Sequence, residues 1–68
     1  MFRRLDELAL MNGDCFRVRN EDAAYVFLSR KCEEVTAVKI TGSDKHFRIF
    51  EPQTLARRLQ VKLTQRIK

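Results

Sequence analysis

The sequence predicts a small, mainly β domain in which five short antiparallel strands follow a short N-terminal helix. Three observations support this fold class. Apolar and polar residues alternate with period two in several segments, which places successive side chains on opposite faces of a strand. One segment is dense in β-branched residues, which favour strands. Short turn sequences separate these segments, as expected for strands joined in antiparallel hairpins.

The size of the chain limits it to one domain, which we expect to span residues 1–68. Hydrophobic residues make up 44% of the chain, and it contains only two Gly and one Pro. This composition is typical of a folded protein. A core of this size rarely stabilises a domain by more than about 3–5 kcal/mol without further support. Self-association as a homodimer is therefore one of the partnerships that we consider.

The N-terminal segment has the pattern of a short helix. Phe2, Leu5 and Leu8 recur every three residues, with acidic residues between them. This spacing predicts one or two helical turns with their apolar side on the domain. The Asn-Gly-Asp sequence at 12–14 then predicts a turn, because Asn and Gly tolerate positive φ.

The first two strands are predicted from about Cys15 and over residues 24–31. In the first, Phe16 and Val18 share one face, and Arg17 and Arg19 share the other. In the second, four apolar residues follow one another at 25–28. This run predicts a central strand that is covered on both faces.

The next two strands are predicted over residues 35–41 and 46–51, joined by a turn at 41–44. In the second of these, Phe47 and Ile49 share one face, and the opposite face carries His46, Arg48 and Phe50. We expect this pair to form an antiparallel hairpin. The assignment of faces predicts that Phe50 points outward beside Arg48.

The C-terminal segment has two interpretations. Pro52 ends the preceding strand, since it lacks an amide hydrogen. Beyond it Leu59, Val61 and Leu63 alternate with polar residues, which predicts a fifth strand with these three side chains inward. The alternative is a basic helix from about Thr54, which aligns Leu55, Leu59, Leu63 and Ile67 but leaves Val61 on the polar side.

The order of these elements, from about Leu8 onward, resembles a small SH3-like barrel or a strongly twisted sheet. Closure of such a barrel removes exposed strand edges. The resemblance is one of layout and includes no diagnostic motif. The alternative fold is a four-stranded sheet with a packed C-terminal helix.

The charge distribution is the main indication of function. Basic and acidic residues balance over residues 1–52, so the whole net charge of +5 comes from the acid-free residues 53–68. A localised basic surface is typical of contact with nucleic-acid phosphates. We therefore expect a small nucleic-acid-binding or regulatory module that binds DNA or RNA. The candidate contact residues are Arg17, Arg19, Lys39, Arg48, Arg57, Arg58, Lys62 and Arg66.

Exposed apolar residues would indicate a different function. Most of the six aromatic residues are needed in so small a core. Tyr25 and Phe50 are the candidates for a partner-binding surface, because their predicted faces are incompletely covered. The alternative function is therefore a protein-interaction module, such as an adaptor, an inhibitor or an assembly subunit.

No pattern in the sequence indicates catalysis, and we expect no enzymatic activity, metal or cofactor. Cys15, Cys32 and His46 share no nucleophile signature, and their spacing does not fit a zinc site. We expect both cysteines to be free thiols. The chain shows neither a targeting segment nor an apolar run long enough for a membrane span, so we expect a cytoplasmic protein.

Overall fold

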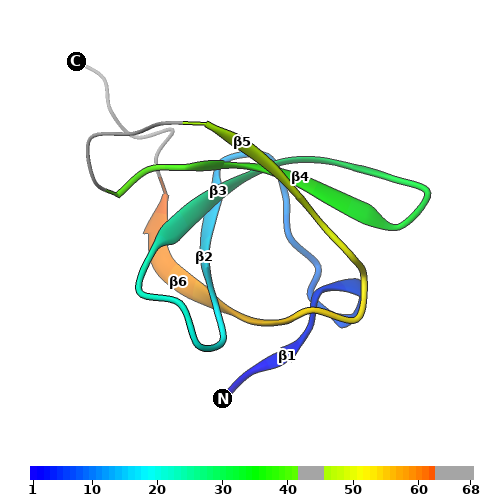
Figure 1. Ribbon diagram of the computed structural model, residues 1–68, viewed down its shortest axis with the longest axis horizontal. Helices are drawn as coiled ribbons and strands as arrows, with labels where there is room; N and C mark the ends of the chain where they lie inside the picture. Colours follow the sequence, from blue (N-terminus) through cyan, green and yellow to red (C-terminus); the bar gives the residue numbers. More distant parts are fainter. Residues whose placement is uncertain (42–45, 63–68) are drawn as a thin grey trace.

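The structure is a computed structural model that describes residues 1–41 and 46–62 of the chain. Its elements follow the chain as seven short segments (Figure 1). They are β1 (Arg3–Arg4), the 3-10 helix η1 (Leu5–Glu7), β2 (Asp14–Val18), β3 (Ala24–Lys31), β4 (Glu34–Lys39), β5 (Phe47–Phe50) and β6 (Leu55–Lys62). No helix in these residues is long and apolar enough to cross a membrane.

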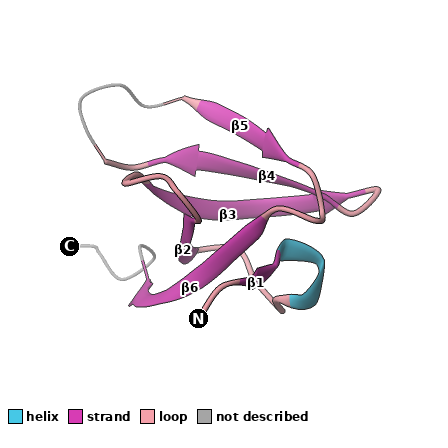
Figure 2. Ribbon diagram, turned by 60° about the horizontal axis from the view of Figure 1, so that its bottom comes forward, coloured by secondary structure: helices cyan, strands magenta, loops and turns pink. Residues whose placement is uncertain are grey.

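The strands form one antiparallel sheet with the order β1-β6-β2-β3-β4-β5. The sheet curls, so that β3, β4 and β5 lie over β6 and β1 (Figure 2). It does not close, because its outermost strands, β1 and β5, do not pair with each other. The predicted mainly β fold is confirmed, whereas barrel closure is not.

The concave side of the sheet holds the core. On β2 the predicted alternation is confirmed, since Phe16 and Val18 belong to the core cluster. β3 was predicted to be a central strand covered on both faces; it lies inside the sheet, Tyr25 and Phe27 belong to the core cluster, and Val26 on its other face is 4% exposed. The rings of Phe16, Tyr25 and Phe50 contact one another, with centroid separations of 4.9–5.8 Å. The remaining buried members are Leu5, Leu10, Val35, Ala37 and Ala56.

The N-terminal segment is not the helix that the spacing predicts. It forms the two-residue strand β1 followed by a single 3-10 turn, in which Leu5 is fully buried. A spacing of three residues matches the 3.0 residues per turn of a 3-10 helix. The turn is fixed from outside: the amide of Leu5 donates to the Thr54 carbonyl (2.8 Å), and that of Asp6 donates to the Pro52 carbonyl (3.0 Å).

Residues 55–62 form a strand, so the basic helix proposed for this segment is wrong over these residues; residues 63–68 lie outside the described part. The predicted inward face needs correction. Ala56 is the core residue, whereas Leu59 is half-buried and outside the core cluster. Ala56 faces the core because it lies opposite Val18 in the regular part of the pairing; the register shifts only beyond Arg58, where Asp14 pairs with Lys62.

The faces of β5 are the reverse of the prediction. Phe50 is 4% exposed and lies in the core, whereas Phe47 and Ile49 are 69% and 65% exposed. The expected hairpin is confirmed, since β4 and β5 pair antiparallel. Its predicted turn at 41–44 lies, apart from Thr41, outside the described residues.

Candidate nucleic-acid interface

Three of the predicted contact residues gather on the convex side of the β2–β6 pair. Arg17 on β2 lies directly opposite Arg57 on β6. Arg19 follows two residues later, and its amide donates to the Leu55 carbonyl (2.9 Å), which extends the pairing by one position. Both Arg19 and Arg57 are exposed, and Arg17 is half-buried. We call Arg17, Arg19 and Arg57 the basic face.

The basic face has no carboxylate to balance it among the described residues. Neither Arg17 nor Arg57 forms an ion pair there. Arg17 donates from Nη2 to the Glu21 carbonyl (3.2 Å), and its Nε is buried without a hydrogen-bond partner. Like charges directly opposite each other in a sheet are destabilising. An anion bound between the two guanidinium groups would remove this repulsion.

An aromatic ring borders the basic face. The guanidinium of Arg57 lies over the ring of Phe2, with its carbon 6.0 Å from the ring centroid. Phe2 precedes β1, which pairs with β6. On β1 the side chain of Arg4 is neutralised by Asp6, whose carboxylate accepts two hydrogen bonds (2.7 and 3.2 Å). Arg4 therefore adds no uncompensated charge beside the basic face.

Arg48 belongs to a different site, at the mouth of the core. Its Nη1 donates to the Glu21 carboxylate (3.0 and 3.2 Å) and to the Tyr25 hydroxyl (2.7 Å). Its guanidinium lies over the rings of Phe50 and Tyr25, at 4.5 and 5.5 Å. Tyr25 in turn donates to Glu21 (2.6 Å). Arg48 thus covers the aromatic core and is already occupied by an anionic group of the protein.

This cluster of Glu21, Tyr25 and Arg48 shifts the ionisation of its members. The hydrogen bond from Tyr25 lowers the pKa of Glu21; partial burial opposes this effect, and Arg48 adds to it. Burial and the hydrogen bond to Glu21 raise the pKa of Tyr25. Burial acts to lower the pKa of Arg48, but hydrogen bonds to Glu21 and Tyr25 outweigh it and raise that pKa. Lys39, opposite Tyr25 on β4, also lowers the pKa of Glu21 through its charge.

Of the remaining predicted contacts, Arg58 does not join the basic face. Arg58 reaches back to the N-terminal loop, where its Nη2 donates to the Ala9 carbonyl (2.7 Å) and its Nε lies 3.8 Å from the carboxylate of buried Asp14. Lys62 pairs through its backbone with Asp14. Arg66 lies outside the described residues.

The two predicted partner-binding residues are both in the core. Tyr25 is 1% exposed and Phe50 is 4% exposed, so neither presents a docking surface. The sequence prediction missed Phe47 and Ile49, which are the exposed apolar residues of β5. The available signal was the alternation itself, which separates these two side chains from Phe50 but does not show which face is buried.

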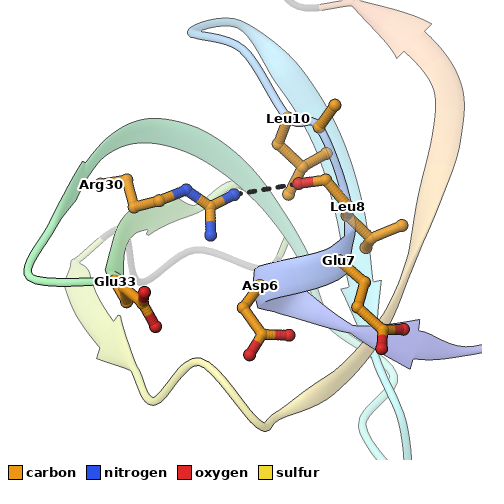
Figure 3. Close-up of a pocket in the computed structure, with 7 residues that line it drawn as sticks. Asp6, Glu7, Leu8, Leu10, Arg30 and Glu33 are labelled. Atoms are coloured by element: carbon orange, nitrogen blue, oxygen red, sulfur yellow. Dashed lines mark hydrogen bonds between the residues drawn. The ribbon is translucent and has the colours of Figure 1, made fainter.

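A cavity of about 350 Å³ lies beside η1, between Arg30 and the acidic side chains of Asp6, Glu7 and Glu33 (Figure 3). Arg30 donates to the carbonyls of Leu5 (3.2 Å) and Leu8 (3.0 Å) and lies over the ring of Phe27. These hydrogen bonds satisfy backbone carbonyls of the 3-10 turn, so Arg30 has a structural role.

No cluster of three or more His, Cys, Asp or Glu side chains is placed to hold a metal ion within residues 1–41 and 46–62. Cys15 and Cys32 are free thiols, the first buried and the second exposed. Comparisons with protein-family models, with curated proteins and with solved structures found no match to this chain.

Proposed function

We propose that this protein is a small non-enzymatic nucleic-acid-binding or regulatory module whose basic face contacts phosphates. The observation that carries the proposal is the direct opposition of Arg17 and Arg57 across β2 and β6, without a carboxylate among the described residues. Two like charges directly opposite each other in a sheet do not stabilise the fold. A bound phosphate would accept hydrogen bonds from both guanidinium groups, which are well suited to phosphate geometry.

The contact set in this proposal is smaller than the one that the sequence predicts. Arg48 is bound to Glu21, and Arg58 is bound to the N-terminal loop. The proposal therefore rests on Arg17, Arg19 and Arg57. Arg19 directly follows β2, and two residues of extended chain span about 6.6 Å. Contacts of this kind follow the backbone and confer little preference for base sequence.

We further propose that the curled sheet is an open variant of the SH3-like layout. Two features support this interpretation: the meander β2-β3-β4-β5, and the return of β6 to pair with β2. In this layout the basic face lies on the convex side of β2 and β6. A nucleic acid would therefore bind outside the core and leave the sheet intact.

Fluorescence anisotropy with labelled single-stranded DNA, duplex DNA and RNA tests the proposed function. We expect binding at low salt that weakens as salt rises. The variant Arg57→Gln should weaken binding to all sequences and reduce the slope of log K against log salt by about 1. The matched control is Lys31→Gln, which removes one exposed positive charge at the distant end of β3. Undetectable binding at low salt, or an equal loss in the control, would refute the proposal.

The second candidate function is a protein-interaction module. The observation that favours it is the exposure of Phe47 and Ile49 on a strand at the edge of the sheet. Exposed apolar side chains that neighbour one another mark interaction surfaces. Tyr25 and Phe50 do not support this function, because both are buried.

A further inference from the structure

The outer edge of β5 pairs with no other strand in residues 1–41 and 46–62, and some of its backbone groups point away from the sheet. β5 pairs only with β4 in the described part of the chain. The amide of Lys39 donates to the His46 carbonyl (3.1 Å), which makes these two residues a hydrogen-bonded pair. Such pairs alternate with non-bonded pairs in an antiparallel ladder. The N–H and C=O groups of Phe47 and Ile49, opposite Val38 and Thr36, therefore point outward from the edge.

The same two residues carry exposed apolar side chains. Phe47 and Ile49 are 69% and 65% exposed on the convex face of the sheet. Edge strands are normally protected against pairing by Lys, by Pro or by a covering segment. The outward positions of β5, Phe47 and Ile49, carry neither Lys nor Pro. The edge thus combines unpaired backbone groups with an apolar surface that would be buried if another strand were added.

We propose that a second copy of this chain occupies this edge, with two β5 strands paired antiparallel about a two-fold axis at Arg48. In this register Phe47 of each copy lies opposite Ile49 of the other. Each such pair exchanges both of its N–H···O bonds, so the outward groups of both strands are satisfied. An aromatic residue opposite a β-branched one is also a favourable cross-strand pair.

The choice of a second copy rests on this self-complementarity and on charge. The strand is followed by Glu51 and preceded by His46, so an antiparallel copy keeps the acidic ends of the two strands apart. The two Arg48 side chains meet at the axis, and each is neutralised by Glu21 of its own chain (3.0 Å). The basic face lies on β2 and β6, and the dimer leaves it uncovered.

Sedimentation of the full chain over a concentration series tests the dimer. We expect reversible dimerisation, and we expect Phe47→Lys and Ile49→Glu each to weaken it about tenfold or more, because a charge replaces a buried apolar side chain at the new interface. The matched control is Met11→Lys, which places the same charge at a residue that is 66% exposed and lies outside β5. The control should dimerise as the wild type does.

Two further measurements test the register. A mixture of Phe47→Lys and Ile49→Glu chains should form heterodimers, because one interface pair then carries opposite charges and the other stays apolar. In the wild type, hydrogen exchange of the Phe47 and Ile49 amides should slow as protein concentration rises. A wild type that stays monomeric up to about 1 mM would overturn the proposal and leave the edge to an extended segment of another protein. A dimer that survives both substitutions would also overturn it.

Discussion

Arg48 is predicted from its sequence position to contact phosphate, but its side chain is bound to Glu21. On β5, Arg48 occupies a position that alternation predicts to be solvated and free for phosphate. Glu21 comes from the turn between β2 and β3, and its carboxylate accepts hydrogen bonds from Arg48 and Tyr25. Long-range contacts of this kind depend on how the sheet curls, and local spacing carries no information about them.

The lowered pKa of Glu21 predicts a pH dependence of stability. A carboxyl whose folded pKa is lowered stabilises the protein above its unfolded pKa, about 4.3, and this contribution is lost as the pH falls through the folded value. The cause is first the hydrogen bond from Tyr25 and then Arg48. We expect Glu21→Gln to lower the free energy of unfolding at pH 7 and to have a smaller effect below pH 4. Urea unfolding across this pH range measures both; a constant difference between the chains would contradict the prediction.

The repulsion between Arg17 and Arg57 predicts a salt-dependent gain in stability. Arg57→Gln should raise the free energy of unfolding by about 0.2–1 kcal/mol at low ionic strength, because it removes a like-charge cross-strand pair. The gain should shrink near 1 M salt, where screening acts over about 3 Å. Urea unfolding of the free protein at two salt concentrations measures it. Lys31→Gln serves as the control, and an equal gain there would show that net charge alone is responsible.

At the scale of elements, the hairpin between β3 and β4 has a tight two-residue tip. Lys31 pairs with Glu34, and the two residues between them, Cys32 and Glu33, have φ values of 50° and 67°. Positive φ at both positions is typical of a type I′ turn, in which Asn-Gly is preferred. We expect Glu33→Gly to raise the free energy of unfolding by about 0.5–1 kcal/mol. Glu34→Gly, in the strand itself, should lower it instead. Thermal unfolding of both variants measures these two changes in stability.

The elements also show what local patterns can and cannot predict. β3 has the predicted bounds, and β2, β4 and β5 differ from theirs by a few residues, because alternation and β-branching act locally. The faces of β5 were assigned wrongly. Both of its faces carry apolar side chains, and only the position of the strand over Phe16 and Tyr25 decides that Phe50 is the buried one. The pairing of Ala56 with Val18 likewise decides which residues of β6 face the core.

For the whole molecule, curling of the sheet is what assembles the core. It brings Phe16, Tyr25 and Phe50 together from three strands that are separated in the sequence. Arg57 and its neighbour Arg58 point to opposite faces because side chains alternate along β6, so Arg58 reaches the N-terminal loop and Arg57 joins the convex face. The charge imbalance predicts a basic surface in residues 53–68, but only Arg57 of the basic face comes from that segment. Which residues form the basic face depends on register and curvature, which composition does not contain.

The core predicts that Phe50 is essential for folding and that Phe47 is not. Phe50→Ala should cost about 3–5 kcal/mol, because it removes a buried ring from a small core and leaves a cavity. A domain of this size has about that much stability in total, so the variant should be largely unfolded at 25 °C. Phe47→Ala makes the same chemical change three residues earlier on the same strand, at a side chain that is 69% exposed. It should alter the free energy of unfolding by no more than about 0.5 kcal/mol. Urea unfolding, at concentrations low enough to keep the chain monomeric, compares the two. If both variants were equally stable, Phe50 would not be a core residue. The faces of β5 would then be those predicted from the sequence, with Phe50 outward.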